Sequence, residues 1–351
     1  MHANSRSDLR RVDLCTLPGA AGPARLRFPH RLSPRAVASI VLACAVLSGG
    51  PGSAETPTEP YPPLGFRPLP VSLAERLEQP VMAPPEAELP ATLDWRDSGI
   101  VTPAKTQQSC GACWAFAAIA CIESMCILAG GSPTLNFSEQ FPISCDVEFR
   151  PMYGVRNEGC CGGSVTVFEF LSENFLMEEA TFPFGNGDYD GTGPRTCDVT
   201  PSWNTVPCPS PYPEQTGWRV ENWMLIAPQP IPGVSELKAA LQEGPVWLGF
   251  RVYEDFIDYW YYEHDTTTPY RHVDGAYLGG HAVLLIGYDD ERQCWIVKNS
   301  WGLTGPFRDG TFLVDYDDAC DFGLNAARVT IEADETPTRQ ATLGSIRALY
   351  R

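Results

Sequence analysis

Cysteine usage constrains this chain more than any other feature. The sequence of 351 residues holds 13 cysteines, and all except Cys15 and Cys44 lie between Cys110 and Cys320. In an oxidising compartment that odd set leaves one thiol for chemistry beside up to five disulfides. Paired Cys-x-x-Cys motifs that hold zinc are absent, because Cys110 to Cys113 is the only one. We therefore expect an exported, disulfide-bonded protein without a metal site.

Charge and composition exclude several classes of protein. With 43 acidic and 25 basic side chains the net charge is −18, and no basic stripe offsets it. Nucleic acids and anionic membranes are therefore poor partners. A hydrophobic content of 44% rules out a disordered acidic chain. No apolar run reaches the roughly 20 residues that cross a bilayer. The length suits one large domain or two lobes.

The first 54 residues predict a leader with a secretory signal peptide. Several arginines precede an apolar stretch from Ala36 to Leu47, and small residues up to Ala54 suit cleavage there. A buried core helix is the alternative, but the flanking residues do not fit one. Cys44 also stands in a lipoprotein-like context, which leaves lipid anchoring open. The expected location is secreted or periplasmic.

Composition divides the rest of the chain into three parts. Residues 55–88 are rich in proline and acid and lack helical periodicity, so we expect an extended linker or a short pro-segment. A folded domain is expected over residues 89–331. The polar residues 332–351 predict a loose C-terminal tail.

One cysteine directly precedes a candidate helix. Residues from Trp114 to Ala129 are apolar on almost every side, which indicates a helix buried between layers. Cys113 lies at its start, where unpaired N–H groups and the positive end of the helix dipole favour a thiolate. Such a thiolate needs a proton partner, and a histidine supplies one as imidazolium.

Only one histidine lies in a rigid context. The others precede the expected cleavage site or lie in a polar stretch that predicts a loop: His2, His30, His264 and His272. His281 instead opens a β-type run over 281–288, and a second strand follows over 294–298. The short connection predicts a hairpin that brings His281 beside Asn299. An amide oxygen at that place would fix the tautomer of the imidazole.

These residues belong to five motifs that together resemble the papain-like cysteine peptidases, the family that includes the cathepsins. In chain order the motifs are Leu93-Asp94-Trp95-Arg96, Gln107 to Phe116, Cys160-Cys161-Gly162-Gly163, Gly280-His281-Ala282 and Asn299-Ser300-Trp301-Gly302. The resemblance covers about residues 89–331. It implies an α+β fold of two lobes with the active site in the cleft between them. A helical lobe is expected over about residues 105–230 and a β-rich, barrel-like lobe over about 231–331.

The resemblance also implies catalytic roles. Cys113 would be the nucleophile, His281 its acid/base partner, and Asn299 the group that orients the imidazole. Gln107 would donate its side-chain amide to the oxyanion, together with the backbone N–H of Cys113. One preorganised donor of this kind is worth about 3 to 4 kcal/mol. No cofactor is implied.

Substrate binding and disulfides follow from the same resemblance. Gly162 and Gly163 would pair with an extended substrate as an added strand, and Gly111 would hold substrate backbone beside the nucleophile. Gly280 would leave a roomy wall next to the scissile bond, and Trp301 would cover the hydrogen bond between His281 and Asn299. The implied disulfides are Cys110–Cys160 and Cys145–Cys197. The remaining cysteines stay unassigned: Cys121, Cys126, Cys161, Cys208, Cys294 and Cys320.

The chain departs from the family pattern at several places. The second tryptophan that follows the Asn-Ser-Trp-Gly turn is replaced by the stretch from Gly305 to Phe307, which puts the packing around Asn299 in doubt. Gly249 falls near the main specificity pocket, so that pocket looks open and its preference is not defined. The long helical pro-domain is missing, which leaves open how activity is restrained.

The sequence thus predicts a secreted cysteine endopeptidase that acts as a monomer on peptide or protein substrates. No insertion that would block one end of the cleft is visible, which favours an endopeptidase over an exopeptidase. An inactive papain-like module that binds peptides without cleaving them is the main alternative. A transpeptidase or exopeptidase variant is the other.

Overall fold

The computed structural model of the chain describes residues 64–70, 89–146, 156–185, 206–227, 231–263 and 266–333. All of them belong to one compact unit that spans Glu59–Arg351. The predicted leader with Cys44, the tail beyond residue 333 and Cys197 lie outside the described residues.

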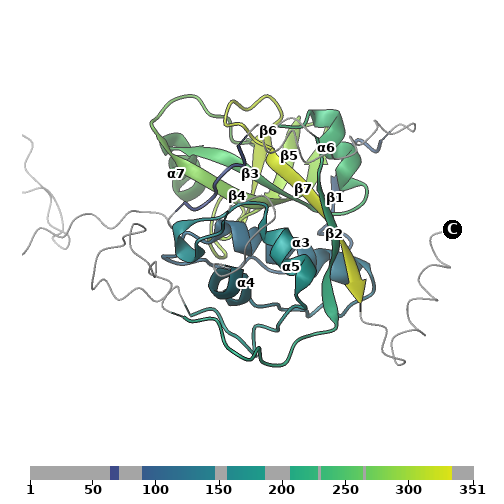
Figure 1. Cartoon of the computed structure of the whole chain (residues 1–351). Coiled ribbons are helices and arrows are strands. Elements are labelled where there is room, and N and C mark those ends of the chain that lie inside the picture. The colour runs from purple at the N-terminus through teal and green to yellow at the C-terminus, as the bar shows by residue number, and fades with distance from the viewer. Residues whose placement is uncertain are drawn as a thin grey trace, which may run out of the picture. The chain divides into compact units, whose positions relative to one another are not determined.

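The helices that begin at Cys113 and follow it form one side of this unit (Figure 1). They are α3 Cys113–Leu128, α4 Gln140–Cys145, the 3-10 turn η2 Gly159–Cys161 and α5 Val167–Glu173. Helix α3 is buried along most of its length because it has apolar side chains on every side, as its sequence predicts. No helix in the described part of the chain is long and apolar enough to cross a membrane.

An antiparallel sheet forms the other side (Figure 1). Its strands are β1 Thr92–Asp94, β2 Trp218–Leu225, β3 Val246–Tyr253, β4 Tyr277–Asp289, β5 Cys294–Lys298, β6 Thr311–Asp315 and β7 Leu324–Ala333. They are ordered β2-β7-β3-β4-β5-β6, and β1 pairs with β4. Two further helices accompany the sheet, α6 Val234–Leu241 and α7 Glu254–Tyr262. Helices on one side and a sheet on the other confirm the predicted two-lobed α+β architecture.

Several local expectations need correction. The predicted hairpin is present, since β4 pairs with β5, but β4 begins at Tyr277, so His281 lies inside the strand and does not open it. The sheet also begins before the expected lobe boundary, because β2 at Trp218–Leu225 pairs with β7. The stretch over residues 258–275, expected as a loop around His264 and His272, begins inside helix α7, which buries Trp260.

The two lobes are packed together through tryptophans. Trp114 at the start of α3 and Trp247 on β3 are both fully buried. The indole Nε1 of Trp247 donates to the backbone oxygen of Trp114 at 3.1 Å. The first turn of the helix that carries Cys113 is thereby fixed to the central strands of the sheet.

The disulfides agree only partly with the expected set. Cys110 is bonded to Cys160, the pairing that the resemblance implied. Cys145 is bonded to Cys208 and not to Cys197. The reason is spatial, since the Cα atoms of Cys145 and Cys208 are 4.9 Å apart, a normal separation for a disulfide. Among the described cysteines, Cys113, Cys121, Cys294 and Cys320 are free thiols.

Candidate active site

Cys113 is the first residue of α3 and is fully buried. The disulfide between Cys110 and Cys160 holds the chain just before it. Backbone hydrogen bonds reach its sulfur from Ala282, the residue after His281, and from Gly65. The nucleophile predicted from the sequence therefore lies beside the strand that carries the predicted base.

Burial dominates the titration of both groups. Burial raises the pKa of the Cys113 thiol to about 11, although hydrogen bonds from backbone groups lower it in part. Burial likewise lowers the pKa of His281 to about 4, against an opposing effect of Asn299. Loss of solvent disfavours the charged form of each group, so the covered site favours a neutral thiol and a neutral imidazole. The thiolate expected from the helix terminus alone is not favoured here.

His281 is oriented by Asn299. The Nε2 atom of His281 lies 2.7 Å from Oδ1 of Asn299, and both side chains are buried. An amide oxygen can only accept, so Nε2 carries the hydrogen in this pair. The other ring nitrogen, Nδ1, is buried without a hydrogen-bond partner among the described residues. The imidazole is thus held at one nitrogen and open at the other.

Aromatic rings cover this pair. The Trp301 and His281 rings lie 4.8 Å apart between centroids, as a covering role for Trp301 requires. Trp260 of α7 packs edge-on against Trp301 at 5.4 Å. A side chain on Gly305 would collide with the Trp260 ring. Trp260 therefore supplies the aromatic packing that the missing second tryptophan of the family motif left in doubt.

Gln107 is fully buried and held at both ends of its amide. Its Nε2 donates to the backbone oxygen of Cys110 at 2.8 Å, and its Oε1 accepts from the Ser300 hydroxyl at 2.7 Å. These bonds attach Gln107 both to the loop before the nucleophile and to the residue after Asn299. An amide carries two N–H groups, and the bond to Cys110 occupies one of them.

A buried amide–carboxyl pair supports the glycine turn. Asn157 Nδ2 donates to Asp146 Oδ2 at 2.6 Å, while its Oδ1 accepts the backbone N–H of Ser164 at 2.7 Å. A Cβ on Gly163 would collide with Oδ1 of Asn157 and with the Trp114 ring. Asn157 therefore fixes the turn at Gly163, and only glycine fits there. Sequence reasoning did not single out this pair.

The described segment 64–70 lies between the two lobes and pairs with the expected substrate-binding glycines. Gly163 donates to the Gly65 oxygen at 2.8 Å and accepts from Arg67 N–H at 2.8 Å, which makes a parallel bridge. Phe66 N–H donates to the Gly280 oxygen at 3.0 Å.

The same segment reaches the other two expected glycines. Side chains built on Gly65 and Gly162 would collide with the backbones of Gly111 and Gly65, respectively. A peptide of this chain thus occupies the place that the sequence assigns to substrate. Nothing in the composition of the proline-rich stretch pointed to this arrangement.

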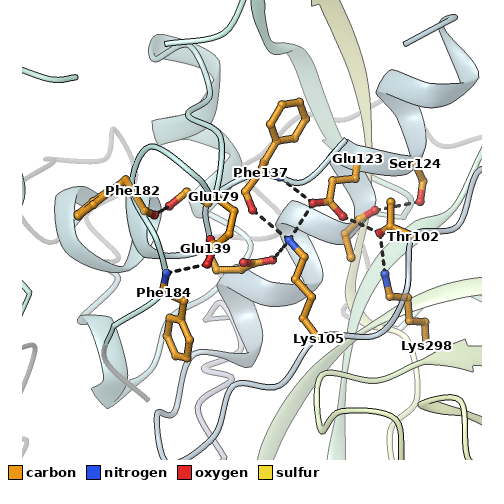
Figure 2. A network of polar contacts seen from close by, with 12 residues as sticks. Thr102, Lys105, Glu123, Ser124, Phe137, Glu139, Glu179, Phe182, Phe184 and Lys298 are labelled. Atoms are coloured by element: carbon orange, nitrogen blue, oxygen red, sulfur yellow. Dashed lines mark hydrogen bonds and ion pairs between the residues drawn. The ribbon is translucent and has the colours of Figure 1, made fainter. Parts of the chain in front are cut away.

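Behind the site, a buried ion network connects α3 to the end of β5 (Figure 2). Lys105 Nζ donates to Glu123 at 2.9 Å and to Glu139 at 2.7 Å. The Thr102 hydroxyl donates to Glu123 at 2.6 Å and accepts from Lys298 Nζ at 3.0 Å. Lys298 directly precedes Asn299, so the network connects Asn299 to helix α3, which begins at Cys113.

The two lysines of this ion network respond differently to burial. Burial by itself would lower the pKa of Lys105, but Glu139 and Glu123 raise it above its usual value. Burial lowers the pKa of Lys298 to about 8, with only partial compensation from Glu123. The sequence signal for the network was Glu123, an acid inside an otherwise apolar helix.

Sequence comparisons agree with this geometry. The model of the papain family cysteine proteases matches residues 89–330. Cathepsin S of Mus musculus is 32% identical over 61% of this chain and 56% of its own length. Cysteine proteinase 1 of Entamoeba histolytica is 28% identical over 61% of this chain and 60% of its own length. The chain thus spans about 60% of the length of such curated relatives.

Solved structures show the same fold. Bromelain from Ananas comosus, in complex with the E64 inhibitor, is 27% identical with a TM-score of 0.51, over 70% of this chain and all of that one. Procathepsin B from Trypanosoma congolense has a TM-score of 0.60 at 21% identity, over 86% of this chain and 99% of that one. With the family model matched over residues 89–330, the chain belongs to the papain family of cysteine proteases.

Proposed function

We propose that this chain is an endopeptidase that cleaves peptide bonds with Cys113 and His281. The pairing of His281 carries the proposal: Nε2 is fixed by Asn299 at 2.7 Å, and Nδ1 is buried and unpaired among the described residues. A ring that is held by one nitrogen can exchange a proton with the other. Cys113, whose sulfur accepts a backbone hydrogen bond from the next residue Ala282, is the group proposed to use this exchange.

The proposed reaction proceeds in two halves. The Cys113 thiol gives its proton to Nδ1 of His281, and the sulfur attacks the substrate carbonyl. The C–N bond breaks as His281 returns the proton to the departing amine, which leaves a thioester on Cys113. Water then attacks the thioester, gives its proton to His281, and releases the acid and the thiol. Gln107 and the backbone N–H of Cys113 are the proposed donors to the oxyanion.

The proposal assigns residues 64–70 the role of a restraining pro-segment. Gly65 supplies a backbone hydrogen bond to the Cys113 sulfur, and the segment contacts both Gly163 and Gly280. A peptide that fills the site keeps substrate and water out. Its presence also contributes to the burial that favours the neutral thiol. Activity is therefore expected only after this segment leaves.

The working unit is proposed to be an exported monomer. The disulfides Cys110–Cys160 and Cys145–Cys208 suit an oxidising compartment. The net charge of −18 supports peptides and not nucleic acids as partners.

A peptide library digested by the full-length protein, before and after limited proteolysis of the segment, tests the function. We expect internal cuts by the wild type after proteolysis and none by Cys113→Ser treated identically. Mass spectra of the products identify the cut positions. Release of terminal dipeptides alone would instead establish an exopeptidase.

The alternative of an inactive peptide-binding module is favoured by one observation, the raised pKa of the buried Cys113 thiol. Iodoacetamide labelling at mildly acidic pH separates the two functions, because ordinary thiols are protonated there. An endopeptidase is expected to label at Cys113 faster than the denatured chain once the segment has left. Equal labelling rates together with uncut peptides would establish the binding module.

A further inference from the structure

Cys161 belongs to a disulfide that the two pairs described above do not include. The residue is disulfide-bonded. The disulfides between described cysteines join other residues, Cys110 to Cys160 and Cys145 to Cys208. The partner of Cys161 is therefore a cysteine outside the described residues.

The sequence leaves one candidate for this partner in a mature chain. The cysteines outside the described residues are Cys15, Cys44 and Cys197. The first two belong to the predicted leader, which ends at Ala54. By elimination, Cys161 pairs with Cys197.

The fold holds the chain that follows Cys197 close to Cys161. Cys208 is bonded to the last residue of α4, and the carboxyl of the next residue accepts a hydrogen bond from Asn157 at 2.6 Å. Asn157 begins the glycine turn, residues 157–163, which contains Cys161. Cys197 precedes Cys208 by 11 residues, and an extended chain of that length reaches about 36 Å. The proposed bond is therefore within easy reach.

The glycine turn needs anchors because of its backbone. Gly159 and Gly162 have φ angles of 58° and 114°, in the region that favours glycine. Glycine loses more conformational freedom on ordering than any other residue, so a turn built on it is costly to hold in one shape. A disulfide reduces this cost, because it limits the freedom of the chain before the turn is ordered.

We propose that Cys161, through a disulfide to Cys197, is a positioning residue that holds the glycine turn in the shape that binds substrate backbone at Gly163. Two adjacent cysteines then anchor the turn in two directions, since Cys160 is bonded to the loop before Cys113. A turn that is ordered in advance loses less entropy when a peptide pairs with it. The disulfide assignment stands by itself, and its effect on substrate rests on the proposed function.

The bond forms by thiol–disulfide exchange. The thiols of Cys161 and Cys197 give two protons and two electrons to a disulfide of the oxidising compartment, which is reduced to two thiols as the new S–S bond forms. Cys113 takes no part in this step and keeps its thiol.

The first experiment maps the bond in the full-length protein. Free thiols are blocked with iodoacetamide, and the unreduced chain is cut with chymotrypsin, whose cut after Trp203 separates Cys197 from Cys208. We expect mass spectra to show the Cys197 peptide linked to the peptide that carries both Cys160 and Cys161. Alkylated Cys197 in the unreduced wild type, or its linkage to a different peptide, overturns the inference.

The variant Cys161→Ser then identifies which of the two adjacent cysteines is bonded. Cys197 should become alkylated in this variant, while Cys110 stays linked to Cys160. A Cys197 peptide that remains linked in Cys161→Ser overturns the assignment.

The second experiment measures substrate binding after limited proteolysis of segment 64–70. In Cys161→Ser, and separately in Cys197→Ser, KM for a peptide substrate should rise at least about fivefold, with kcat within about twofold of the wild type. The double variant should match the single ones, because all three lack the same bond. Unchanged KM in both single variants overturns the positioning role.

Cys294→Ser is the matched control, because it makes the same exchange at a free thiol on β5. It should leave KM within about twofold of the wild type. If the wild type cleaves nothing, the proposed function fails, and the turn is judged by how well a peptide protects Cys113 from alkylation. Cys161→Ser should then need at least about fivefold more peptide than the wild type for equal protection, and equal concentrations overturn the positioning role.

Discussion

Two buried polar clusters connect the helical lobe to the sheet, and they differ in how their atoms are paired. In the ion network of Figure 2, Glu123 accepts from both Lys105 and Thr102. In the proposed catalytic cluster of Cys113, His281 and Asn299, the His281 ring has one hydrogen-bond partner, and its second nitrogen has none among the described residues. Buried polar atoms are normally paired, so the unpaired Nδ1 needs an explanation, and the proposed proton exchange with Cys113 supplies one. We expect substitutions in the ion network to lower the free energy of unfolding. We expect substitutions in the cluster around His281 to lower kcat.

The largest expected effect is on the catalytic cluster. Cys113→Ser and His281→Ala should each lower kcat on the order of 10⁴-fold or more, because the nucleophile or its proton partner is lost. Their melting temperatures should stay within a few degrees of the wild type. Peptide cleavage and thermal unfolding of the same samples check both. Substantial turnover by Cys113→Ser would contradict the assignment.

Substitutions in the ion network should instead lower stability. Glu123→Ala removes a fully buried carboxylate that pairs with Lys105 and accepts from Thr102, and it takes away the main charge that compensates the buried Lys298. It should lower the free energy of unfolding by about 3 to 5 kcal/mol. Denaturant unfolding measures this change. Glu221→Ala, on an exposed part of β2, is the control and should change stability by less than about 0.5 kcal/mol. A Glu123→Ala protein as stable as this control would remove the contrast between the clusters.

Asp146 sharpens the comparison because it is buried beside Asn157 with no ion pair to a described cation. Burial raises its pKa from 3.8 to about 8. The folded state therefore keeps a proton that the unfolded chain releases, and stability falls as pH rises from about 4 to about 8, by at most about 1.4 kcal/mol per pH unit.

Asp146→Asn should flatten this pH dependence, since the amide does not titrate. Urea unfolding at several pH values compares it with the wild type and with Asp97→Asn at an exposed position. Parallel curves for Asp146→Asn and the wild type would show that Asp146 is ionised in the folded protein.

Asn299→Ala should have an intermediate effect. It removes one hydrogen bond to His281 but neither reacting group, so kcat should fall about 10- to 100-fold. Unchanged kcat would mean that Trp301 alone orients the ring. Steady-state kinetics after removal of the segment gives the value.

The smallest effect is expected at the partly exposed ion pair of segment 64–70. Arg67 donates to Glu158 at 2.7 Å, and both side chains are more than 40% exposed. Such pairs contribute about 0 to 1 kcal/mol, so Arg67→Ala should increase the Cys113 alkylation rate less than about fivefold. A larger increase would show that the bond from Arg67 to the Cys161 oxygen, at 2.7 Å, also matters.

The sequence predicted the parts that depend on local patterns. The apolar run after Cys113 predicted a buried helix. The β-type run at His281, with a second strand after a short connection, predicted a hairpin that brings His281 to Asn299. The pairing of Cys145 with Cys208 could not be read in this way, because spacing does not determine which cysteines meet.

Long-range contacts account for the rest of what the sequence did not reveal. Trp260 lies in a different part of the chain from the missing tryptophan of the motif. Its ring packs against Gly305 and fills that role. Phe66 packs against Trp247 from a proline-rich stretch whose composition predicts only extended backbone. Both contacts join residues that are far apart in sequence, and no local period encodes them.

Segment 64–70 and the site belong to one chain, and this determines how the proposed inhibition responds to dilution. Because inhibitor and target belong to one polypeptide, their effective concentration is set by chain length and does not change with the amount of protein. Dilution of the protein into a large volume therefore leaves the site occupied. A single cut within residues 71–88 changes this, since the freed peptide becomes an ordinary ligand that diffuses away, and the onset of activity then reports the cut itself.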